Sequence, residues 1–325
     1  MVKQLSEVLE GAVSVGIAGH VKPDGDCVGS CLSVYNYIQK IYPQAKPEIF
    51  LEPIPNIFKF LKNAEQINSE YPAHEEFDLF IALDCGDKNR LGKAADYFEH
   101  AKETICIDHH VSNDSFAKEN VVFPDASSTC EIVYELMDKT QIDEKIAECI
   151  YTGMVHDTGV FQYSCTSAKT MNIAGELMDK GIAFTKIIDE TFYEKTYEQN
   201  RILGQALIDS KIYFGGKIIS TVVTAEQMKA YHVFPKHLEG IVSQLRATKG
   251  VDAALFLYEN ADHSWKASMR SNEIVDCAAI AVQFGGGGHV RAAGATIEGD
   301  VEEILKNVLE EMKKQLKAAK KQEQN

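Results

Sequence analysis

Short apolar segments alternate with helical stretches through the first half of this 325-residue chain. The segments lie at residues 13–18, 47–51, 78–83 and 104–108, and residues 28–40 have the apolar spacing of a helix. Strands that are apolar along their whole length need cover on both faces, which the intervening helices can provide. The alternation therefore predicts an α/β fold in which helices cover both faces of a parallel sheet.

The pattern changes near residue 128 and again near residue 213. The stretch from 128 is mostly helical, and the charged, proline-free segment that follows it predicts a connecting helix. Short apolar runs beyond that segment predict a smaller α/β domain, which ends in an amphipathic helix from Val301. The expected parts are a first domain, a connecting helix, a second domain and a disordered tail, at residues 1–185, 186–211, 212–318 and 319–325.

The composition limits which partners such a chain can bind. Its formal net charge is −15, whereas proteins that grip long nucleic acids through many phosphates carry a basic face. We therefore expect a small anionic substrate that is held by a few local cationic groups. The sequence contains neither a membrane-spanning apolar run nor a secretory signal pattern, so we expect a cytoplasmic protein with no membrane partner.

Eight cysteines are scattered along the chain without any CxxC pair. Several lie inside apolar runs, as Cys106 does, which is typical of small buried residues in a reducing compartment. Cys27 and Cys31 are four residues apart, but they supply too few ligands for a metal site by themselves.

Polar residues follow three of the predicted strands at their carboxyl ends, where open α/β sheets bind ligands. Together with an aspartate that follows a later helical segment, they are His20, Asp24, Asp26, Asp84, Asp108, His109, His110 and Asp157. Each group has an ordinary explanation on its own, since Asp24-Gly25-Asp26 is typical of a turn or a helix cap. Several carboxylates at one sheet edge would repel one another, however, unless cations compensate their charge. Oxygen-rich ligation with some imidazole favours Mn²⁺ over Zn²⁺, so the joint pattern predicts a divalent metal centre.

The ordered motifs resemble those of the DHH phosphoesterases. They are His20-x-x-Pro-Asp-x-Asp-x-x-Gly-Ser30, Asp84, Asp108-His-His110, Asp157-Thr-Gly-x-Phe161 and Gly285-Gly-Gly-Gly-His-Val-Arg-Ala-Ala-Gly294. The last segment is similar to the glycine-rich signature of the DHH-associated domain, so the resemblance spans nearly the whole chain. Its length, and its lack of extra modules, are similar to the branch of nanoRNases and phosphatases of pAp (3′-phosphoadenosine 5′-phosphate).

The resemblance implies two divalent metal ions, for which Mn²⁺ is the expected metal. The ligands that it implies for the first ion are His20, Asp24 and Asp84. Those that it implies for the second ion are Asp26, Asp84, His109 and Asp157, so that Asp84 would bridge the two ions. It further implies that His110 faces the substrate phosphate and that Asp108 orients the neighbouring imidazoles. His156 lies where the motif does not require histidine, and we assign it no ligand role.

The second domain is expected to bind the substrate. Arg270 matches a basic position that the family uses to bind a terminal phosphate. The glycine run could be a flexible loop without function, but glycine also lets backbone N–H groups approach an anion closely. The substrate-binding residues that the resemblance implies are Arg270, Gly285, Gly286, Gly287, Gly288 and His289. The role of Arg291 stays open.

The activity that the resemblance implies is removal of 5′-mononucleotides from short oligoribonucleotides, and conversion of pAp to AMP. The same O3′–P bond would break in both substrates, with a 5′-phosphate held by the second domain. Two metal ions held roughly 3.5–4 Å apart can activate water for in-line displacement, so no protein nucleophile is needed. Short DNA is a further expected substrate, and a homodimer is an expected assembly.

Two other functions stay open at this stage. A phosphodiesterase specialised for linear dinucleotides, such as pApA or pGpG, would have the same catalytic domain, and only relative rates would separate the two. A nucleotide-binding sensor could keep the metal centre without turnover, although such a protein would usually lack a ligand and none is missing here. A pyrophosphatase or an exopolyphosphatase shares the metal motifs but should lack the glycine-rich segment, so neither is favoured.

Overall fold

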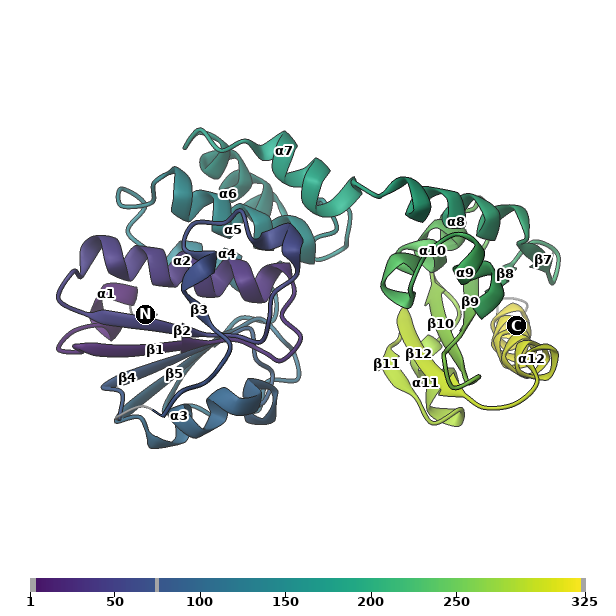
Figure 1. Cartoon of the computed structure of the whole chain (residues 1–325), viewed down its shortest axis with the longest axis horizontal. Coiled ribbons are helices and arrows are strands. Elements are labelled where there is room, and N and C mark those ends of the chain that lie inside the picture. The colour runs from purple at the N-terminus through teal and green to yellow at the C-terminus, as the bar shows by residue number, and fades with distance from the viewer. Residues whose placement is uncertain (1–3, 74–75, 323–325) are drawn as a thin grey trace. The chain divides into compact units, whose positions relative to one another are not determined.

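The chain divides into two compact units, Met1–Glu194 and Lys195–Asn325. The computed structural model describes residues 4–73 and 76–322 of the chain (Figure 1). The first unit has a parallel sheet with helices on both faces, and the second has a smaller mixed sheet with its own helices. The predicted fold class is therefore confirmed.

Six strands form the sheet of the first unit, and each neighbouring pair is parallel. They are β1 (Ser14–Ala18), β2 (Lys46–Phe50), β3 (Ile67–Asn68), β4 (Leu79–Leu83), β5 (Glu103–Asp108) and β6 (Glu119–Val122). Their order is β3-β2-β1-β4-β5-β6, so the chain builds outward from β1 and then returns to continue on its other side from β4. Such a reversal of strand order opens a ligand crevice at the carboxyl ends of the two strands.

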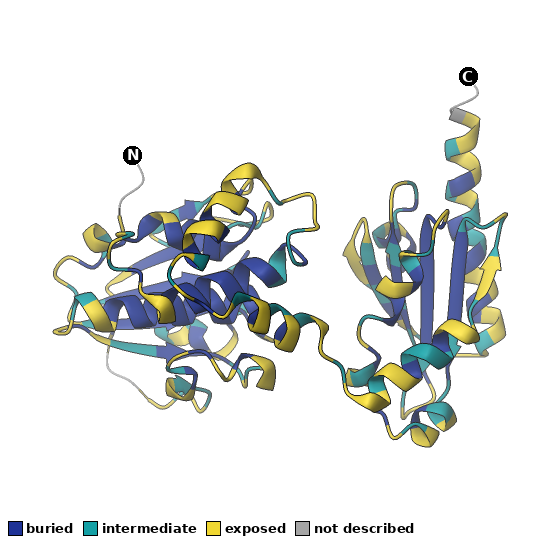
Figure 2. Cartoon of the chain, turned by 90° about the horizontal axis from the view of Figure 1, so that it is seen from above, coloured by how far each residue is buried: buried dark blue, intermediate teal, exposed yellow. Residues whose placement is uncertain are grey.

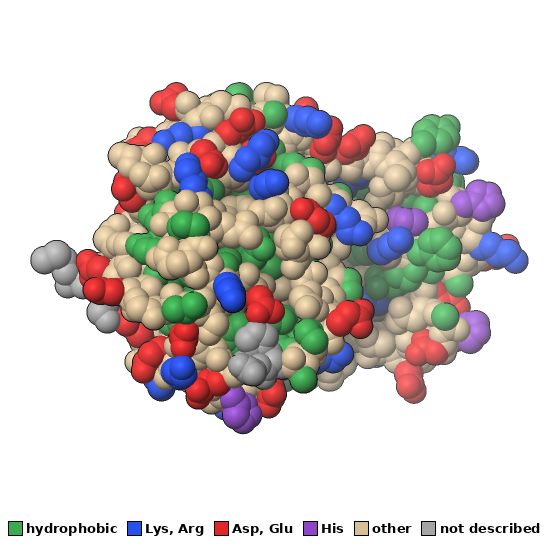
Figure 3. All heavy atoms as spheres, turned by 60° about the vertical axis from the view of Figure 1, so that its left-hand side comes forward, with side chains coloured by type: hydrophobic (Ala, Val, Ile, Leu, Met, Phe, Trp, Pro, Cys, Tyr) green, Lys and Arg blue, Asp and Glu red, His purple; other side chains and the backbone are tan. Residues whose placement is uncertain are grey.

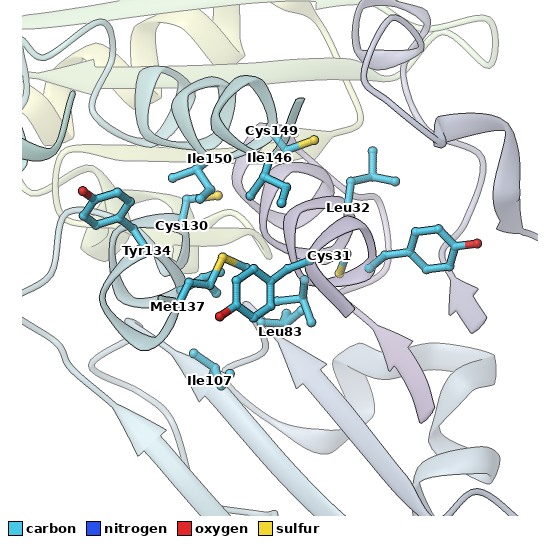
Figure 4. Close-up of a cluster of buried hydrophobic side chains, with 14 of the residues drawn as sticks. Cys31, Leu32, Leu83, Ile107, Cys130, Tyr134, Met137, Ile146, Cys149 and Ile150 are labelled. Carbon is cyan, nitrogen blue, oxygen red and sulfur yellow. The ribbon is translucent and has the colours of Figure 1, made fainter. Parts of the chain in front are cut away.

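Helices cover both faces of this sheet. The helices of the first unit are α1 (Leu5–Val8), α2 (Gly25–Ile41), α3 (Ala95–His100), α4 (Thr129–Leu136), α5 (Glu144–Asp157), α6 (Ala168–Met178) and α7 (Phe184–Ile188), of which α6 and α7 pack on other helices. On one face, side chains of α2, α4 and α5 meet Leu83 of β4 and Ile107 of β5 in one apolar core (Figure 4). On the other face, Phe98 of α3 packs edge-on against Phe80 of β4.

The helix α2 is buried at every residue from Gly25 to Ile38, so it has no exposed face over most of its length (Figure 2). At Gly29 the helix lies close to the backbone of α5. A Cβ atom at Gly29 would lie 2.5 Å from the carbonyl oxygen of Cys149, so a larger residue would force the two helices apart. This packing fixes the start of α2 and the end of α5, and both carry predicted metal ligands.

The second unit contains six strands in the order β11-β12-β10-β9-β8-β7, of which β8 and β9 are parallel and the other neighbours antiparallel. They are β7 (Lys211–Tyr213), β8 (Ile218–Val223), β9 (Ala253–Glu259), β10 (Trp265–Ser271), β11 (Gly287–His289) and β12 (Ala292–Ile297). The helices are α8 (Tyr197–Ile208), α9 (Ala225–Ala230), α10 (Ile241–Arg246), α11 (Cys277–Gln283) and α12 (Val301–Gln322). Apolar clusters on the two faces of the sheet bury β9, one with α11 and α12 and the other with α8 and α10 (Figure 2).

Two predicted boundaries differ from the structure. The segment 186–211 is not one connecting helix, because α7 leads into a π-helical turn at Asp189–Tyr193 and α8 begins only after an extended residue, Glu194. Thr196 and Gln199 form a reciprocal capping box that starts this new helix. The tail predicted to be disordered is helical as far as Gln322, because α12 continues through it, and residues 323–325 lie outside the described part.

The charged side chains on the surface agree with the expectation that the net charge gave. On the face shown in Figure 3, acidic and basic side chains are interspersed and form no extended basic patch. Among the described residues, no helix combines the length and the apolar character that crossing a bilayer requires.

Candidate metal centre

The carboxyl ends of β1, β4 and β5 bring the predicted ligands to one edge of the first sheet. The loop after β1 and the first turn of α2 carry three of them, Asp84 follows β4, His109 follows β5, and Asp157 ends α5. We call these residues the six-residue cluster, and its members are His20, Asp24, Asp26, Asp84, His109 and Asp157. The structure brings all six together, although the first and the last are 137 residues apart in the sequence (157 − 20).

The first group within the cluster surrounds His20. Its Nε2 lies 3.5 Å from Oδ2 of Asp24 and 3.4 Å from Oδ2 of Asp84. Its Nδ1 lies 2.9 Å from the carbonyl oxygen of Val21, to which it can only donate. That hydrogen bond fixes the tautomer and leaves Nε2 as the nitrogen that faces the two carboxylates.

The second group surrounds His109. Its Nε2 lies 3.1 Å from Oδ2 of Asp157, 3.7 Å from Oδ1 of Asp84 and 4.0 Å from Oδ2 of Asp26. Its Nδ1 lies 3.4 Å from the carbonyl oxygen of Ala126, on the side away from the carboxylates. Both histidines of the cluster thus present Nε2 to acidic oxygens and Nδ1 to a backbone carbonyl.

Asp84 belongs to both groups. Its Oδ2 faces His20, and its Oδ1 faces His109, so one buried carboxylate directs one oxygen toward each set of ligands. The backbone of Asp84 is left-handed, with φ of 59°, a conformation that side-chain-bearing residues other than Asn and Asp rarely adopt. Strained backbone of this kind is typical of sites where the position of a side chain matters more than local stability.

The electrostatics of the cluster favour bound cations. Burial, together with the carboxylates of Asp84 and Asp157, raises the pKa of Asp26 well above its ordinary value, and burial raises the pKa of Asp157. Burial alone would lower the pKa of His20, but hydrogen bonds with Asp24 and Asp84 raise it to about 11. The carboxylates therefore need positive charge, which protons supply when no metal is present and which divalent ions would supply when bound.

The donor set fits two divalent ions. Four carboxylates and two imidazole nitrogens form it, and this oxygen-rich set suits Mn²⁺ or Mg²⁺ better than the Cys and His ligands that Zn²⁺ favours. Cys27 also lies near His20 and Asp84, but burial raises the pKa of its thiol well above the ordinary value. Its Sγ donates to the carbonyl oxygen of His20 at 3.8 Å, which is a supporting contact and not a metal bond.

His110 and Asp108 stand beside the cluster. Nδ1 of His110 donates to Oδ1 of Asp108 at 2.7 Å, and this hydrogen bond raises the pKa of His110. Nδ2 of Asn113 donates to the other oxygen of Asp108, also at 2.7 Å. Sequence reasoning missed Asn113, because nothing in its local sequence distinguishes it from an ordinary turn residue.

His156 points into a different environment. Its ring lies edge-on to Phe58, with centroids 4.9 Å apart, and its Nε2 lies 2.9 Å from the hydroxyl of Thr191. Burial lowers its pKa to about 4, so it stays neutral at physiological pH. It packs against Gly25, where a Cβ atom would lie 2.4 Å from its ring. His156 thus supports the start of α2 from an aromatic pocket.

The predicted substrate residues of the second unit lie on neighbouring strands. In the register of the sheet, Arg270 of β10 pairs with Ala292 of β12, which in turn pairs with His289 of β11. The three residues therefore form one row on one face of the sheet. Two strand spacings separate the Cα atoms of Arg270 and His289, which is about 10 Å. A small anion over Ala292 would lie between a guanidinium and an imidazole.

The glycine-rich segment is not a free loop. The N–H of Gly285 donates to Val282 at 3.2 Å, and that of Gly286 donates to Ala281 at 2.9 Å, so these two amides end α11. A Cβ atom at Gly286 would lie 2.1 Å from the carbonyl oxygen of Gly294, which accounts for that glycine by packing. Gly287, Gly288 and His289 form the exposed edge strand β11.

Two residues on the same face were missed by the sequence analysis. Lys266 and Ser268 precede Arg270 by four and two positions on β10, and all three are half-buried while their neighbours are buried. Side chains two apart on a strand share a face, so the alternation in Trp265-Lys-Ala-Ser-Met-Arg270 is a signal that could have found them.

An acidic, imidazole-containing metal centre at the carboxyl edge of a parallel sheet is typical of metal-dependent hydrolases. Similarity to known families identifies the particular family of hydrolases. Residues 14–154 match the model of the DHH family N-terminal domain, and residues 215–318 match that of the DHHA1 domain. The chain belongs to the DHH family, in the branch that combines the catalytic domain with a DHHA1 domain.

Full-length relatives support the same assignment. The chain is 30% identical over 324 residues to a bifunctional oligoribonuclease and PAP phosphatase NrnA of Thermus thermophilus, covering 98% of this chain and 94% of that protein. It is 25% identical over 283 residues to the NrnA of Bacillus subtilis, covering 86% and 87%. A solved structure of an exopolyphosphatase-related protein from Bacteroides fragilis has a TM-score of 0.87 and 28% identity, covering 95% of this chain and 94% of that one. The predicted family is confirmed.

Proposed function

We propose that this protein is a two-metal phosphoesterase that degrades short oligoribonucleotides from the 5′ end and dephosphorylates pAp to AMP. The observation that carries the proposal is the Asp84 carboxylate, whose two oxygens face two separate groups of ligands. The similarity over nearly the full length to relatives named for both activities supports this choice of substrates. Because all eight cysteines are free thiols, we propose the cytoplasm as its compartment.

The ligands follow from the two groups. His20, Asp24 and Asp84 would hold one ion, and Asp84 would share the second ion with Asp26, His109 and Asp157. Two such ions, when bound, would lower the pKa of a water molecule and stabilise negative charge at the phosphoryl group. Mn²⁺ is the proposed metal, because four carboxylates and two imidazoles suit it.

The residues beside the cluster would serve the phosphoryl group. Asp108 holds the Nδ1 proton of His110, so Nε2 is the nitrogen that remains for the substrate. Because the same hydrogen bond raises the pKa of His110, the ring keeps its second proton to higher pH than an isolated histidine would. A protonated Nε2 can donate to a phosphoryl oxygen as negative charge builds up on it.

The second unit would recognise the 5′-phosphate through Arg270 and His289. A guanidinium binds phosphate with parallel hydrogen bonds, and Gly287 and Gly288 of the exposed strand β11 have no side chains that would block an anion. Cleavage of the O3′–P bond then yields AMP and phosphate from pAp, and a 5′-mononucleotide from a short RNA.

The proposed function is tested by one panel of substrates with Mn²⁺: pAp, pApA, pGpG, a five-nucleotide RNA, a long single-stranded DNA and inorganic polyphosphate. We expect turnover of pAp and of the short RNA, and much slower turnover of the long DNA. Strong preference for pApA or pGpG would instead indicate a specialised dinucleotide phosphodiesterase. Binding of pAp without release of phosphate would indicate a sensor.

Removal of metal is expected to abolish activity and to lower stability. Chelator-treated protein should lose phosphate release from pAp, and Mn²⁺ should restore it. An ion at a hundred times its dissociation constant stabilises the folded state by about 2.7 kcal/mol. That stabilisation should raise the melting temperature of the first unit by roughly 5–10 °C in calorimetry. Full activity in the presence of excess chelator would contradict the proposal.

His110→Ala is expected to lower kcat for pAp by about 10²–10³-fold, the typical effect of losing one donor to the transition state. Asp108→Asn should have a smaller effect, because it removes the orienting carboxylate and leaves the imidazole. Mn²⁺ binding, measured by calorimetry, should change little in His110→Ala, since Nδ1 of His110 is bonded to Asp108. A loss of Mn²⁺ binding that matches the loss of kcat would make His110 a ligand instead.

A further inference from the structure

The turn that begins α4 contacts three members of the six-residue cluster. The N–H groups of Thr129 and Cys130 donate to the two oxygens of Asp26, at 2.6 and 2.9 Å. The hydroxyl of Thr129 donates to Oδ1 of Asp84 at 3.0 Å. The carbonyl oxygen of Ala126, just before the turn, lies 3.4 Å from Nδ1 of His109. One short segment therefore touches ligands from three other parts of the chain.

The hydroxyl of Thr129 is not needed for the helix that it begins. Ser128 is the N-cap of α4, and its side chain accepts a hydrogen bond from the N–H of Glu131 at 3.1 Å. Thr129 is fully buried, and its hydroxyl is directed at Asp84. The choice of Thr at this position is thus accounted for by the carboxylate and not by helix formation.

The oxygen that Thr129 contacts is the one that faces His109. The terminal torsion of an aspartate is soft, so its carboxylate can turn unless neighbours hold it. Such a rotation of the carboxylate would move both oxygens of Asp84 away from the two groups of ligands that they face. The hydrogen bond from Thr129 to Oδ1 opposes this motion.

The buried carboxylate of Glu131 stabilises this turn. Oε2 of Glu131 accepts hydrogen bonds from the hydroxyls of Ser127 at 2.6 Å and Thr170 at 2.7 Å. Its other oxygen lies 3.5 Å from Nζ of Lys169. The Thr129 hydroxyl therefore belongs to a turn that contacts with helix α6 hold in place.

We propose that Thr129 is a positioning residue, which holds the Asp84 carboxylate in the orientation that lets it serve both metal ions. This inference rests on the proposed two-metal function. Partners that orient metal ligands typically affect metal affinity or activity by about 10–100-fold when they are removed.

Four variants test the role of the hydroxyl. Thr129→Val keeps the shape and removes the hydroxyl, whereas Thr129→Ser keeps the hydroxyl. Thr152→Val is the matched control, because Thr152 is equally buried and its hydroxyl donates to the carbonyl oxygen of Glu148 within α5. Thr129→Ala replaces Thr129→Val if the valine variant does not fold, since its difference from Thr129→Ser still isolates the hydroxyl.

Mn²⁺ binding to metal-free protein, measured by calorimetry without substrate, is the primary measurement. We expect Thr129→Val to weaken Mn²⁺ binding about 10–100-fold and to lower kcat for pAp, with KM changed less than about threefold. Thr129→Ser and Thr152→Val should bind Mn²⁺ as the wild type does. Wild-type affinity and kcat in folded Thr129→Val would overturn the proposal, as would equal losses in Thr152→Val.

The measurement separates this proposal from the proposed function. If the wild type binds Mn²⁺ but cleaves none of the nucleotides, the function is wrong, while the affinity of Thr129→Val still decides the role of Thr129. Failure of the wild type to bind Mn²⁺ would overturn the metal centre, and the proposal for Thr129 with it.

Discussion

Asp84→Asn is expected to remove Mn²⁺ binding at both sites and to lower kcat for pAp by at least about 10³-fold, since metal ions supply several kcal/mol of transition-state stabilisation. Asp84 is the one member of the cluster whose two oxygens face both His20 and His109. Its loss therefore affects two ions, whereas the loss of Asp24 or Asp157 would affect one. Asn is the suitable substitution because it tolerates the left-handed backbone at this position, so the variant tests charge and not strain.

Asp87→Asn is the matched control for Asp84→Asn. Asp87 follows the same strand, and its carboxylate caps the next helical turn by accepting from the N–H groups of Asn89 and Arg90. Asparagine caps helices about as well as aspartate, so Asp87→Asn should change stability little and leave Mn²⁺ binding unchanged. Two Mn²⁺ ions bound per chain of Asp84→Asn, or activity within tenfold of the wild type, would refute a bridging role.

Arg270→Ala is expected to raise KM for pAp by about 10–100-fold, because a hydrogen bond to a charged group contributes about 1.5–3 kcal/mol. The effect on kcat should be smaller, since Arg270 belongs to the second unit and the cluster belongs to the first. The decisive measurement compares a dinucleotide with a 5′-phosphate and the same dinucleotide with a 5′-hydroxyl. The wild type should prefer the phosphorylated form, and Arg270→Ala should lose that preference.

Arg246→Ala provides the comparison for Arg270→Ala. Arg246 lies on α10 in the same unit, and its guanidinium is already bonded to the side chain of Asn272. Its removal should leave the preference for a 5′-phosphate intact. If both variants lose the preference equally, a general change of charge explains the effect and Arg270 has no special role.

The sequence was sufficient for the main strands and for the residues that follow them. Apolar runs such as Leu79–Leu83 and Thr104–Asp108 are long and continuous enough to predict buried parallel strands, and ligands at their ends follow from topology. Short edge strands such as Ile67–Asn68 were not predictable, because two residues carry no periodic signal. The break before α8 was missed because its capping box, Thr196 with Gln199, lies inside an otherwise helical pattern.

The supporting contacts of the site were beyond sequence reasoning for a different reason. Thr129 and Asp26 are separated by 103 residues, and only the packing of α4 against α2 reveals their hydrogen bond. In the second unit, the relation of Arg270 to His289 depends on the strand register through Ala292, which no local pattern specifies. The glycines at 286 and 288 were interpreted as anion contacts, whereas the structure also accounts for them by close packing on β12.

The long-range bond between Asp26 and the start of α4 has a consequence for biosynthesis. During synthesis, His20 is the first ligand of the cluster to be added to the chain. The turn that orients Asp26 follows about a hundred residues later, and Asp157 comes last. Until then, the nascent chain carries carboxylates that repel one another and lack their amide partners. Because domains fold as units during translation, we expect the metal centre to close only after α5 and α6 have emerged, when most of the second unit is still to be made.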